Sequence, residues 1–150
     1  MKLTIRPADS ANAKDMVTLT TRSITELCAA DHDNEPQLLA EWLDNKTVEQ
    51  MTNWIEQPDN YVIVAYSDEV MVAAGGTNIH GRILRNYVHP EYRFKGISRA
   101  IMAAMEKYLR GLGLKQATLE SSKTAFEFYL SCGWKMVETD DKKIEMIKIL

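Results

Sequence analysis

A basic turn between two predicted elements contains the groups needed to hold a phosphate. Val88 closes a β-rich run, and Pro90 stops the strand because its nitrogen has no hydrogen to donate to a neighbouring strand. Gly96 permits a tight turn and a close approach of the backbone to a ligand. The next helix begins with unpaired amides and the positive end of its dipole, so the turn favours an anion.

Three basic side chains strengthen this prediction. Arg93, Lys95 and Arg99 fall within or just after the turn and form the notable local basic cluster of the chain. Their full charges would add to the backbone dipole in binding a phosphate group. The alternative is an ordinary strand-turn-helix connection with solvated charges, because a single turn motif is weak evidence for a site.

The spacing of the turn resembles the pyrophosphate loop of the GNAT superfamily of N-acetyltransferases, Val-x-x-x-x-Arg/Gln-x-x-Gly-x-Gly/Ala. Ser98 takes the final small position, where its hydroxyl suits the start of a helix. The resemblance implies that acetyl-CoA is bound by the turn and by the strand before it. The implied cofactor-binding residues are Asn86, Tyr87, Val88, Arg93, Phe94, Lys95, Gly96, Ile97, Ser98 and Arg99.

The strand residues in this set are expected to act through their backbone. The resemblance assigns to Asn86, Tyr87 and Val88 the pairing with pantetheine and the hydrogen bond to the acetyl carbonyl. Strand splaying would leave amides there without a ladder partner, and pantetheine could then pair with them as an added strand does.

A second resemblance lies near the end of the chain, where Ala125-x-x-Phe128-Tyr129-x-x-x-Gly133-Trp134 is similar to a GNAT signature. The resemblance implies that Tyr129 is catalytic and protonates the departing thiolate. A phenol with a pKa of about 10 keeps its proton at neutral pH and can donate it as charge develops on sulfur. The alternative is a core aromatic residue whose hydroxyl bonds to the backbone.

The acceptor implied by this family is an amine, which is protonated at neutral pH and needs a base. Glu120, at the end of a predicted strand, is the first candidate. His80 in a turn, and Asp31, His32 and Asp33 in a polar segment, are the others. For each of them, a solvated or structural role is the alternative.

Three further polar residues lie near these elements. His89, beside a proline, is expected to end the strand rather than act as a base. Arg82 and Arg85 either bind an acidic group of the substrate or face water, and the sequence leaves both possibilities open.

Hydrophobic periodicity and turn residues place these groups on alternating strands and helices. The expected strands span 3–6, 61–66, 70–74, 83–88, 116–120, 134–137 and 144–150, and the expected helices span 9–28, 37–43, 47–55, 96–112 and 124–130. This order matches the GNAT fold over the whole chain. We therefore expect one GNAT acetyltransferase domain over residues 1–150, an α/β fold with a central mixed, mostly antiparallel sheet flanked by helices.

Composition limits the function classes. The 150 residues are 45% apolar and 26% charged with a net charge of −3, which fits a soluble globular domain and argues against nucleic-acid binding. No apolar run is long enough to span a membrane, and no secretory signal begins the chain. Cys28 and Cys132 are far apart without metal-ligand spacing, so no metal is expected. Because neither a membrane span nor a secretory signal is predicted, we expect a cytoplasmic location.

The combined interpretation is an enzyme that transfers an acetyl group from acetyl-CoA to a primary amine of a small molecule or peptide, by direct attack in a ternary complex. The alternative is a non-catalytic acyl-CoA sensor, or an interaction module of the same fold. A homodimer is a further expectation, because residues 144–150 are predicted to form a terminal edge strand that invites pairing.

Overall fold

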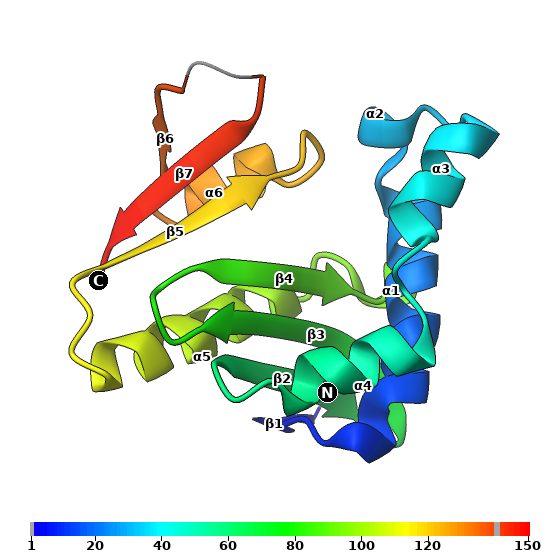
Figure 1. Ribbon diagram of the computed structural model, residues 1–150, viewed down its shortest axis with the longest axis horizontal. Helices are drawn as coiled ribbons and strands as arrows, with labels where there is room; N and C mark the ends of the chain where they lie inside the picture. Colours follow the sequence, from blue (N-terminus) through cyan, green and yellow to red (C-terminus); the bar gives the residue numbers. More distant parts are fainter. Residues whose placement is uncertain (1, 140–141) are drawn as a thin grey trace.

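The computed structural model describes residues 2–139 and 142–150 (Figure 1). The strands are β1 (Leu3–Pro7), β2 (Asn60–Ser67), β3 (Val70–Asn78), β4 (Ile83–Val88), β5 (Gln116–Ser121), β6 (Lys135–Val137) and β7 (Ile144–Ile149). The helices are α1 (Ala13–Leu27), α2 (Ala29–His32), α3 (Pro36–Leu43), α4 (Val48–Glu56), α5 (Ile97–Gly111) and α6 (Phe126–Ser131), with 3-10 turns η1 (Ser10–Asn12) and η2 (Pro90–Tyr92).

The strands form two antiparallel sheets that touch at one point. The first sheet has the order β1-β2-β3-β4, and the second has the order β5-β7-β6. A single parallel bridge joins Arg82, just before β4, to Thr118 of β5, where the Thr118 amide donates to the Gly81 carbonyl at 2.8 Å. Beyond this bridge β4 and β5 diverge (Figure 1), and no described strand pairs with the outer edge of β4.

Helices cover both faces of the first sheet, with α4 in front and α5 behind in Figure 1. The inner face of α5 is formed by Ile97, Ile101, Met105 and Leu109, which recur at helical spacing and are at most 1% exposed. The other face of the sheet packs against α1 and α4 in a second cluster that includes Met51. Burial of the inner face of α5 and of the cluster formed with α1 and α4 fixes the sheet between the helices.

A β-bulge and a glycine shape the middle of β4 and β3. Gly76 pairs with Arg85 and Thr77 pairs with Ile83, so Leu84 is an extra residue on β4. Bulges increase the local twist of a strand and redirect its side chains. Opposite the bulge, a Cβ on Gly76 would lie 2.4 Å from Cη2 of Trp54, so the indole packs directly on the glycine backbone.

Two expectations from the sequence need correction. Residues 29–36 include the short helix α2, which the polar composition did not predict. The predicted terminal edge strand, residues 144–150, is wrong as an edge, because β7 lies between β5 and β6 and is paired on both sides. The pairing argument for a homodimer is therefore weakened, since β5 pairs along the whole of β7 and β6 pairs with residues 145–147 on its other side.

In the described part of the chain, no helix is both long and apolar enough to cross a bilayer.

Gly76→Ala should destabilise the protein because the added methyl group displaces the rigid indole of Trp54. Overpacking of this kind costs about 1–3 kcal/mol, and each kcal/mol lowers the melting temperature by roughly 2–4 °C in a chain of this size. Differential scanning calorimetry measures the shift. Gly111→Ala is the control, because its Cβ would meet nothing within 4 Å at the end of α5. Equal melting temperatures for the two variants would contradict the packing argument.

Candidate active site

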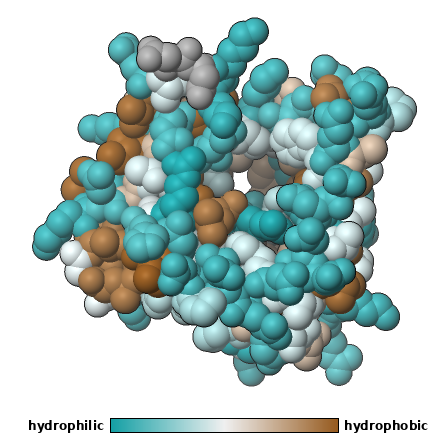
Figure 2. Space-filling model, in the orientation of Figure 1, coloured by the Kyte–Doolittle hydropathy of each residue, from teal (hydrophilic) through white to brown (hydrophobic). Residues whose placement is uncertain are grey.

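A cavity of about 590 Å³ opens where β4 and β5 diverge. Its walls come from the end of α1, from β4, from the turn before α5, and from β5 and α6. Figure 2 shows a hollow near the centre of the molecular face that it presents. Tyr129, Glu120 and the residues predicted to bind the cofactor all line the cavity, with the exception of Lys95, which is exposed outside it.

The turn before α5 has the backbone that an anion site requires. Gly96 has φ 77° and ψ 8°, a left-handed conformation that favours glycine, and it is the N-cap of α5 without a side-chain cap. The first helical bond runs from the Ala100 amide to the Gly96 carbonyl at 3.0 Å. The amides of Ile97, Ser98 and Arg99 therefore have no partner further back in the helix.

Three side chains in and just after the turn have notable surroundings. Phe94 has φ 62° and is 92% exposed, an unusual combination for a bulky residue. The guanidinium carbon of Arg93 lies 4.6 Å from the centre of the Phe94 ring. Arg99 donates from Nη2 to Ser131 Oγ at 3.1 Å, which links the start of α5 to the end of α6.

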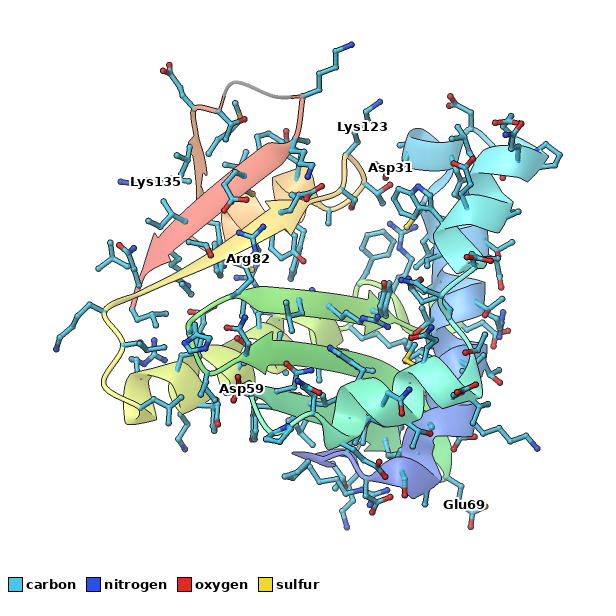
Figure 3. The ribbon with its side chains drawn as sticks, viewed as in Figure 1. Asp31, Asp59, Glu69, Arg82, Lys123 and Lys135 are labelled. Carbon is cyan, nitrogen blue, oxygen red and sulfur yellow. The ribbon has the colours of Figure 1, made fainter. Side chains whose placement is uncertain are left out.

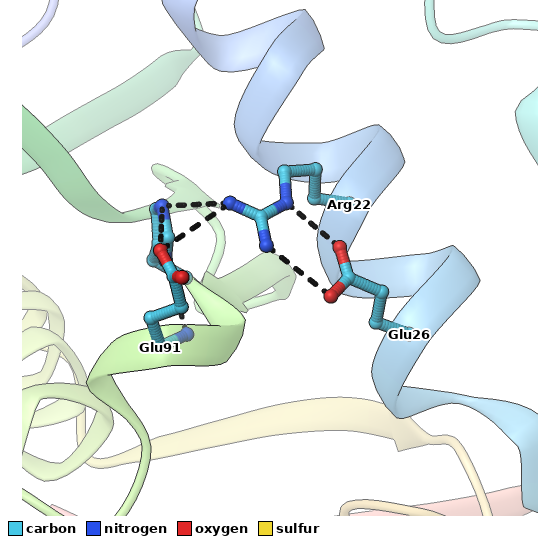
Figure 4. A network of polar contacts seen from close by, with 4 residues as sticks. Arg22, Glu26 and Glu91 are labelled. Atoms are coloured by element: carbon cyan, nitrogen blue, oxygen red, sulfur yellow. Dashed lines mark hydrogen bonds and ion pairs between the residues drawn. The ribbon is translucent and has the colours of Figure 1, made fainter.

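A polar network holds the turn against α1 (Figure 4). Arg22 of α1 donates to both oxygens of Glu26, at 2.7 and 3.2 Å. Its Nη1 lies 3.6 Å from Glu91 Oε2 and 3.3 Å from His89 Nε2. The Glu26 hydrogen bond raises the pKa of Arg22, which keeps the cation charged. His89 Nδ1 accepts the Glu91 amide hydrogen and caps η2, as expected of a residue that ends the strand.

Tyr129 lines the cavity and is 7% exposed. Asn86 Nδ2 donates to its hydroxyl oxygen at 3.5 Å, so this contact does not use the phenolic hydrogen. Burial raises the pKa of Tyr129, and the Asn86 hydrogen bond offsets only part of that effect. The phenol therefore remains protonated at neutral pH and retains a hydrogen to donate.

Asn86 and Tyr87 add polar groups beside this phenol. Asn86 Oδ1 is buried without a hydrogen-bond partner among the described residues. Burial also raises the pKa of the Tyr87 hydroxyl, which lines the same cavity. On the facing strand, Glu120 lines the cavity with an exposed side chain, so it can exchange protons with water.

The structure gives the other candidate bases different roles. Asp31 accepts hydrogen bonds from the Lys123 amide at 2.8 Å, the Thr124 amide at 3.2 Å and Thr124 Oγ1 at 2.6 Å. It thereby joins α2 to the loop after β5, and Figure 3 shows Asp31 beside Lys123. His32 is fully buried, with Nε2 2.8 Å from the Ile24 carbonyl and Nδ1 accepting from the Asn34 amide.

His80 and Asp33 also lie outside the cavity lining. His80 is exposed in the turn between β3 and β4, where its amide donates to Asn78 Oδ1 at 2.9 Å. Asp33 is exposed and ends α2 with φ 53°. Of the candidate bases named from the sequence, the structure brings Glu120 alone to the cavity.

The structure gives Arg82 and Arg85 different surroundings. Arg82 forms an ion pair with Glu145 of β7 and donates to Thr118 Oγ1 at 3.2 Å, so it holds the two sheets together (Figure 3). Arg85 lines the cavity.

The cavity also has a helical wall. Trp42 of α3 lines it, a residue whose helical spacing in the sequence fits either core packing or groove lining. The sequence motifs did not indicate the other residues of this wall, which are Ser23 and Leu27 of α1 and Cys28 just after it. Burial, and then the nearby Asp31 charge, raise the pKa of Cys28 to about 11, so this residue remains a thiol. The apolar stripe of α1 was the available signal, but a stripe does not distinguish core packing from cavity lining.

No group of three His, Cys, Asp or Glu side chains within the described residues could hold a metal ion.

Comparison with known proteins begins with the sequence. Residues 28–148 match the family model of the acetyltransferase (GNAT) domain. No curated protein sequence matches the chain significantly.

Solved structures share the fold. The PaiA N-acetyltransferase from Thermoplasma acidophilum, in complex with coenzyme A, aligns over 100% of both chains with a TM-score of 0.90 and 21% identity. A GCN5-related N-acetyltransferase from Rhodopseudomonas palustris aligns over 100% of this chain and 97% of its own, with a TM-score of 0.85 and 20% identity. An aminoglycoside 6'-N-acetyltransferase complexed with coenzyme A aligns over 97% and 96%, with a TM-score of 0.73 and 16% identity. The predicted fold class is confirmed.

Gly96→Glu should abolish stabilisation by coenzyme A, because a side chain and a negative charge would enter the proposed phosphate site. For the unaltered protein, ligand at about 100 times its dissociation constant adds about 2.7 kcal/mol, or roughly 5–10 °C in melting temperature. Thermal shift assays with and without coenzyme A measure this difference.

Gly113→Glu is the matched control for this test. Gly113 also has a positive φ, 85°, with nothing within 4 Å of its Cβ, but it follows the end of α5 and does not line the cavity. This variant should lose stability from backbone strain and still gain the coenzyme A shift. The same shift in both variants would overturn the assignment of the turn.

Lys46→Met should raise the melting temperature at pH 7. Burial, and then the Arg85 charge, lower the pKa of Lys46 from 10.5 to about 8. Between pH 8 and pH 10.5 the unfolded chain therefore binds a proton on Lys46 more readily than the folded chain does. The resulting loss of folding free energy reaches its full size below pH 8. We expect the variant to melt a few degrees higher at pH 7 and the gap to narrow as pH rises from 8 towards 10.5. A gap that does not change with pH would contradict this pKa.

Proposed function

Because the chain belongs to the GNAT acetyltransferase family, we propose that it transfers an acetyl group from acetyl-CoA to a primary amine of a small molecule or peptide. The observation that carries the proposal is the meeting of three features in one cavity. These are the turn at Gly96, the unpaired edge of β4 and the protonated phenol of Tyr129. The coenzyme A in two of the structural neighbours supports an acyl-CoA donor.

The fold suggests how the donor would be held. The pyrophosphate would accept hydrogen bonds from the free amides that follow Gly96, with Arg93 adding charge beside them. Pantetheine would run along the outer edge of β4, where no described strand occupies the backbone groups. This course carries the thioester from the start of α5 towards Asn86 and Tyr129.

The reaction needs no nucleophile from the protein. The amine nitrogen attacks the thioester carbonyl carbon, the carbon–sulfur bond breaks, and the electron pair leaves on sulfur. The Tyr129 hydroxyl would give its proton to this sulfur, since Asn86 binds only the phenolic oxygen. Glu120 would take the proton that the ammonium loses before attack, directly or through water, because its carboxylate is in the cavity on the opposite strand. The second proton, which leaves the nitrogen after attack, would restore the Tyr129 phenol through water.

A thiol-release assay with acetyl-CoA tests this function against a panel of polyamines, amino acids, arylamines and N-terminal peptides. Thiol release with at least one amine, together with the acetylated amine by mass spectrometry, is the expected result. Stabilisation by acetyl-CoA without thiol release from any amine would instead indicate a sensor of acyl-CoA.

Tyr129→Phe should lower turnover by at least about tenfold, because a general acid typically contributes a factor of about 100 to 10,000. The ring remains, so the acetyl-CoA thermal shift should stay close to that of the unaltered protein. Tyr108→Phe is the control, because its ring stacks on Tyr61 at 3.7 Å and does not line the cavity. Unchanged turnover in Tyr129→Phe, with intact binding, would make Tyr129 a packing residue.

A further inference from the structure

The guanidinium of Arg85 is a cation in the cavity wall without a carboxylate partner among the described residues. Its side chain contacts Trp54, whose ring centre lies 4.4 Å from Cζ, and Met51, whose Sδ lies 3.4 Å from Nη1. A thioether sulfur is a weak acceptor, and a guanidinium has five N–H donors. Most of the hydrogen-bonding capacity of Arg85 is therefore left for a ligand.

The fold holds this cation in place rather than leaving it free at the surface. Gly76, which pairs with Arg85 across the strands, has no Cβ and so admits the indole of Trp54. The indole then provides the flat surface on which the guanidinium lies. Burial lowers the pKa of Arg85 because its surroundings disfavour the charge, and the nearby Tyr87 offsets only part of that effect.

The position of Arg85 separates it from the site expected for the cofactor phosphates. Its partners Met51 and Trp54 belong to α4, which packs on one face of the first sheet. Gly96 begins α5, which packs on the opposite face. The next residue, Asn86, reaches the Tyr129 hydroxyl, so Arg85 lies beside the proposed reaction centre but on the side away from the phosphate turn.

A second cation adds to the positive charge on this side. Lys46, in the connection between α3 and α4, is partly buried, and its hydrogen-bond partner is the neutral Asn45. The Arg85 charge contributes to lowering the pKa of Lys46, so the two cations influence one another. Positive charge in this region favours an anionic ligand.

The opposite wall of the cavity has the opposite charge. Glu120 on β5 is the one acidic residue among the described residues that line the cavity. An acceptor with an ammonium at one end and an acid at the other would place its amine near Glu120 and its acid near Arg85. Long cationic amines would instead meet uncompensated positive charge on the Arg85 side.

We propose that the acceptor carries an anionic group, a carboxylate or a phosphate, in addition to its amine, and that Arg85 binds this group. This inference rests on the proposed function, because it names the class of amine that the acetyltransferase accepts.

Matched pairs of amines test the proposal in the thiol-release assay. The pairs are β-alanine with its amide and O-phosphoethanolamine with ethanolamine, and spermidine is the cationic probe. We expect kcat/KM for at least one acidic amine to exceed that of its neutral partner by tenfold or more. The pair with the larger ratio identifies the acid as carboxylate or phosphate. Neutral amines or spermidine used as well as the acidic ones by the unaltered protein would overturn the proposal.

Variants then assign the preference to Arg85. Arg85→Gln should lower kcat/KM for the preferred acidic amine at least tenfold, and should change that of its neutral partner by less than threefold. Arg85→Lys should recover part of the acidic preference, because it restores the charge. Arg110→Gln, an exposed charge in the last turn of α5, is the control and should leave both values unchanged. An unchanged ratio in Arg85→Gln would overturn the proposal. If Arg85→Gln does not fold, Arg85→Lys provides the test, because its acidic preference should fall below that of the unaltered protein, and an unchanged ratio there would overturn the proposal.

A binding measurement separates this proposal from the proposed function. If no amine releases thiol, acetyl transfer is refuted, and calorimetry with coenzyme A present then measures binding of β-alanine and O-phosphoethanolamine directly. Binding that is lost in Arg85→Gln would support the anion site even without turnover. No binding of either probe to the unaltered protein would overturn it.

Discussion

The separation of β4 from β5 is the constraint on which the rest of this site depends. The two strands are held at one end by the bridge between Arg82 and Thr118 and by the ion pair of Arg82 with Glu145. Beyond that point the backbone of β4 is open on its outer side, where a sheet would ordinarily continue. An open edge exposes amide and carbonyl groups without a hydrogen-bond partner from another strand, and here these groups face a cavity.

Because side chains of a strand alternate between faces, β4 serves two chemical environments at once. Asn86 points to Tyr129 on the α5 side, whereas Arg85 lies against Trp54 on the α4 side. A thioester held along the edge of β4 would thus have a proton donor on one side and a charged wall on the other. Gly76 makes the second arrangement possible, because any larger residue would occupy the space of the indole.

Two polar connections hold the helical wall of the cavity in place. Arg22 joins α1 to η2, and Asp31 joins α2 to the loop that precedes α6. The Arg22–Glu26 pair is exposed, and surface pairs of this kind stabilise a fold only weakly. The contribution of Arg22 is therefore mainly geometric, and both connections set the distance between α1 and α2 and the elements that surround the cavity.

The sequence by itself determined the strands and the longer helices, the turn at Gly96 and the pattern around Tyr129, because hydrophobic period, glycine and proline act on neighbouring residues. It also proposed Glu120 as a base but could not separate it from His32 or Asp31. Only the tertiary structure decided between them, by burying His32 against a carbonyl and binding Asp31 to a loop 92 residues away. The same holds for Arg82 and Arg85, which are alike in sequence. Arg82 pairs with Glu145, whereas Arg85 packs on the indole of Trp54, because contacts between distant segments of the chain decide which charges are neutralised.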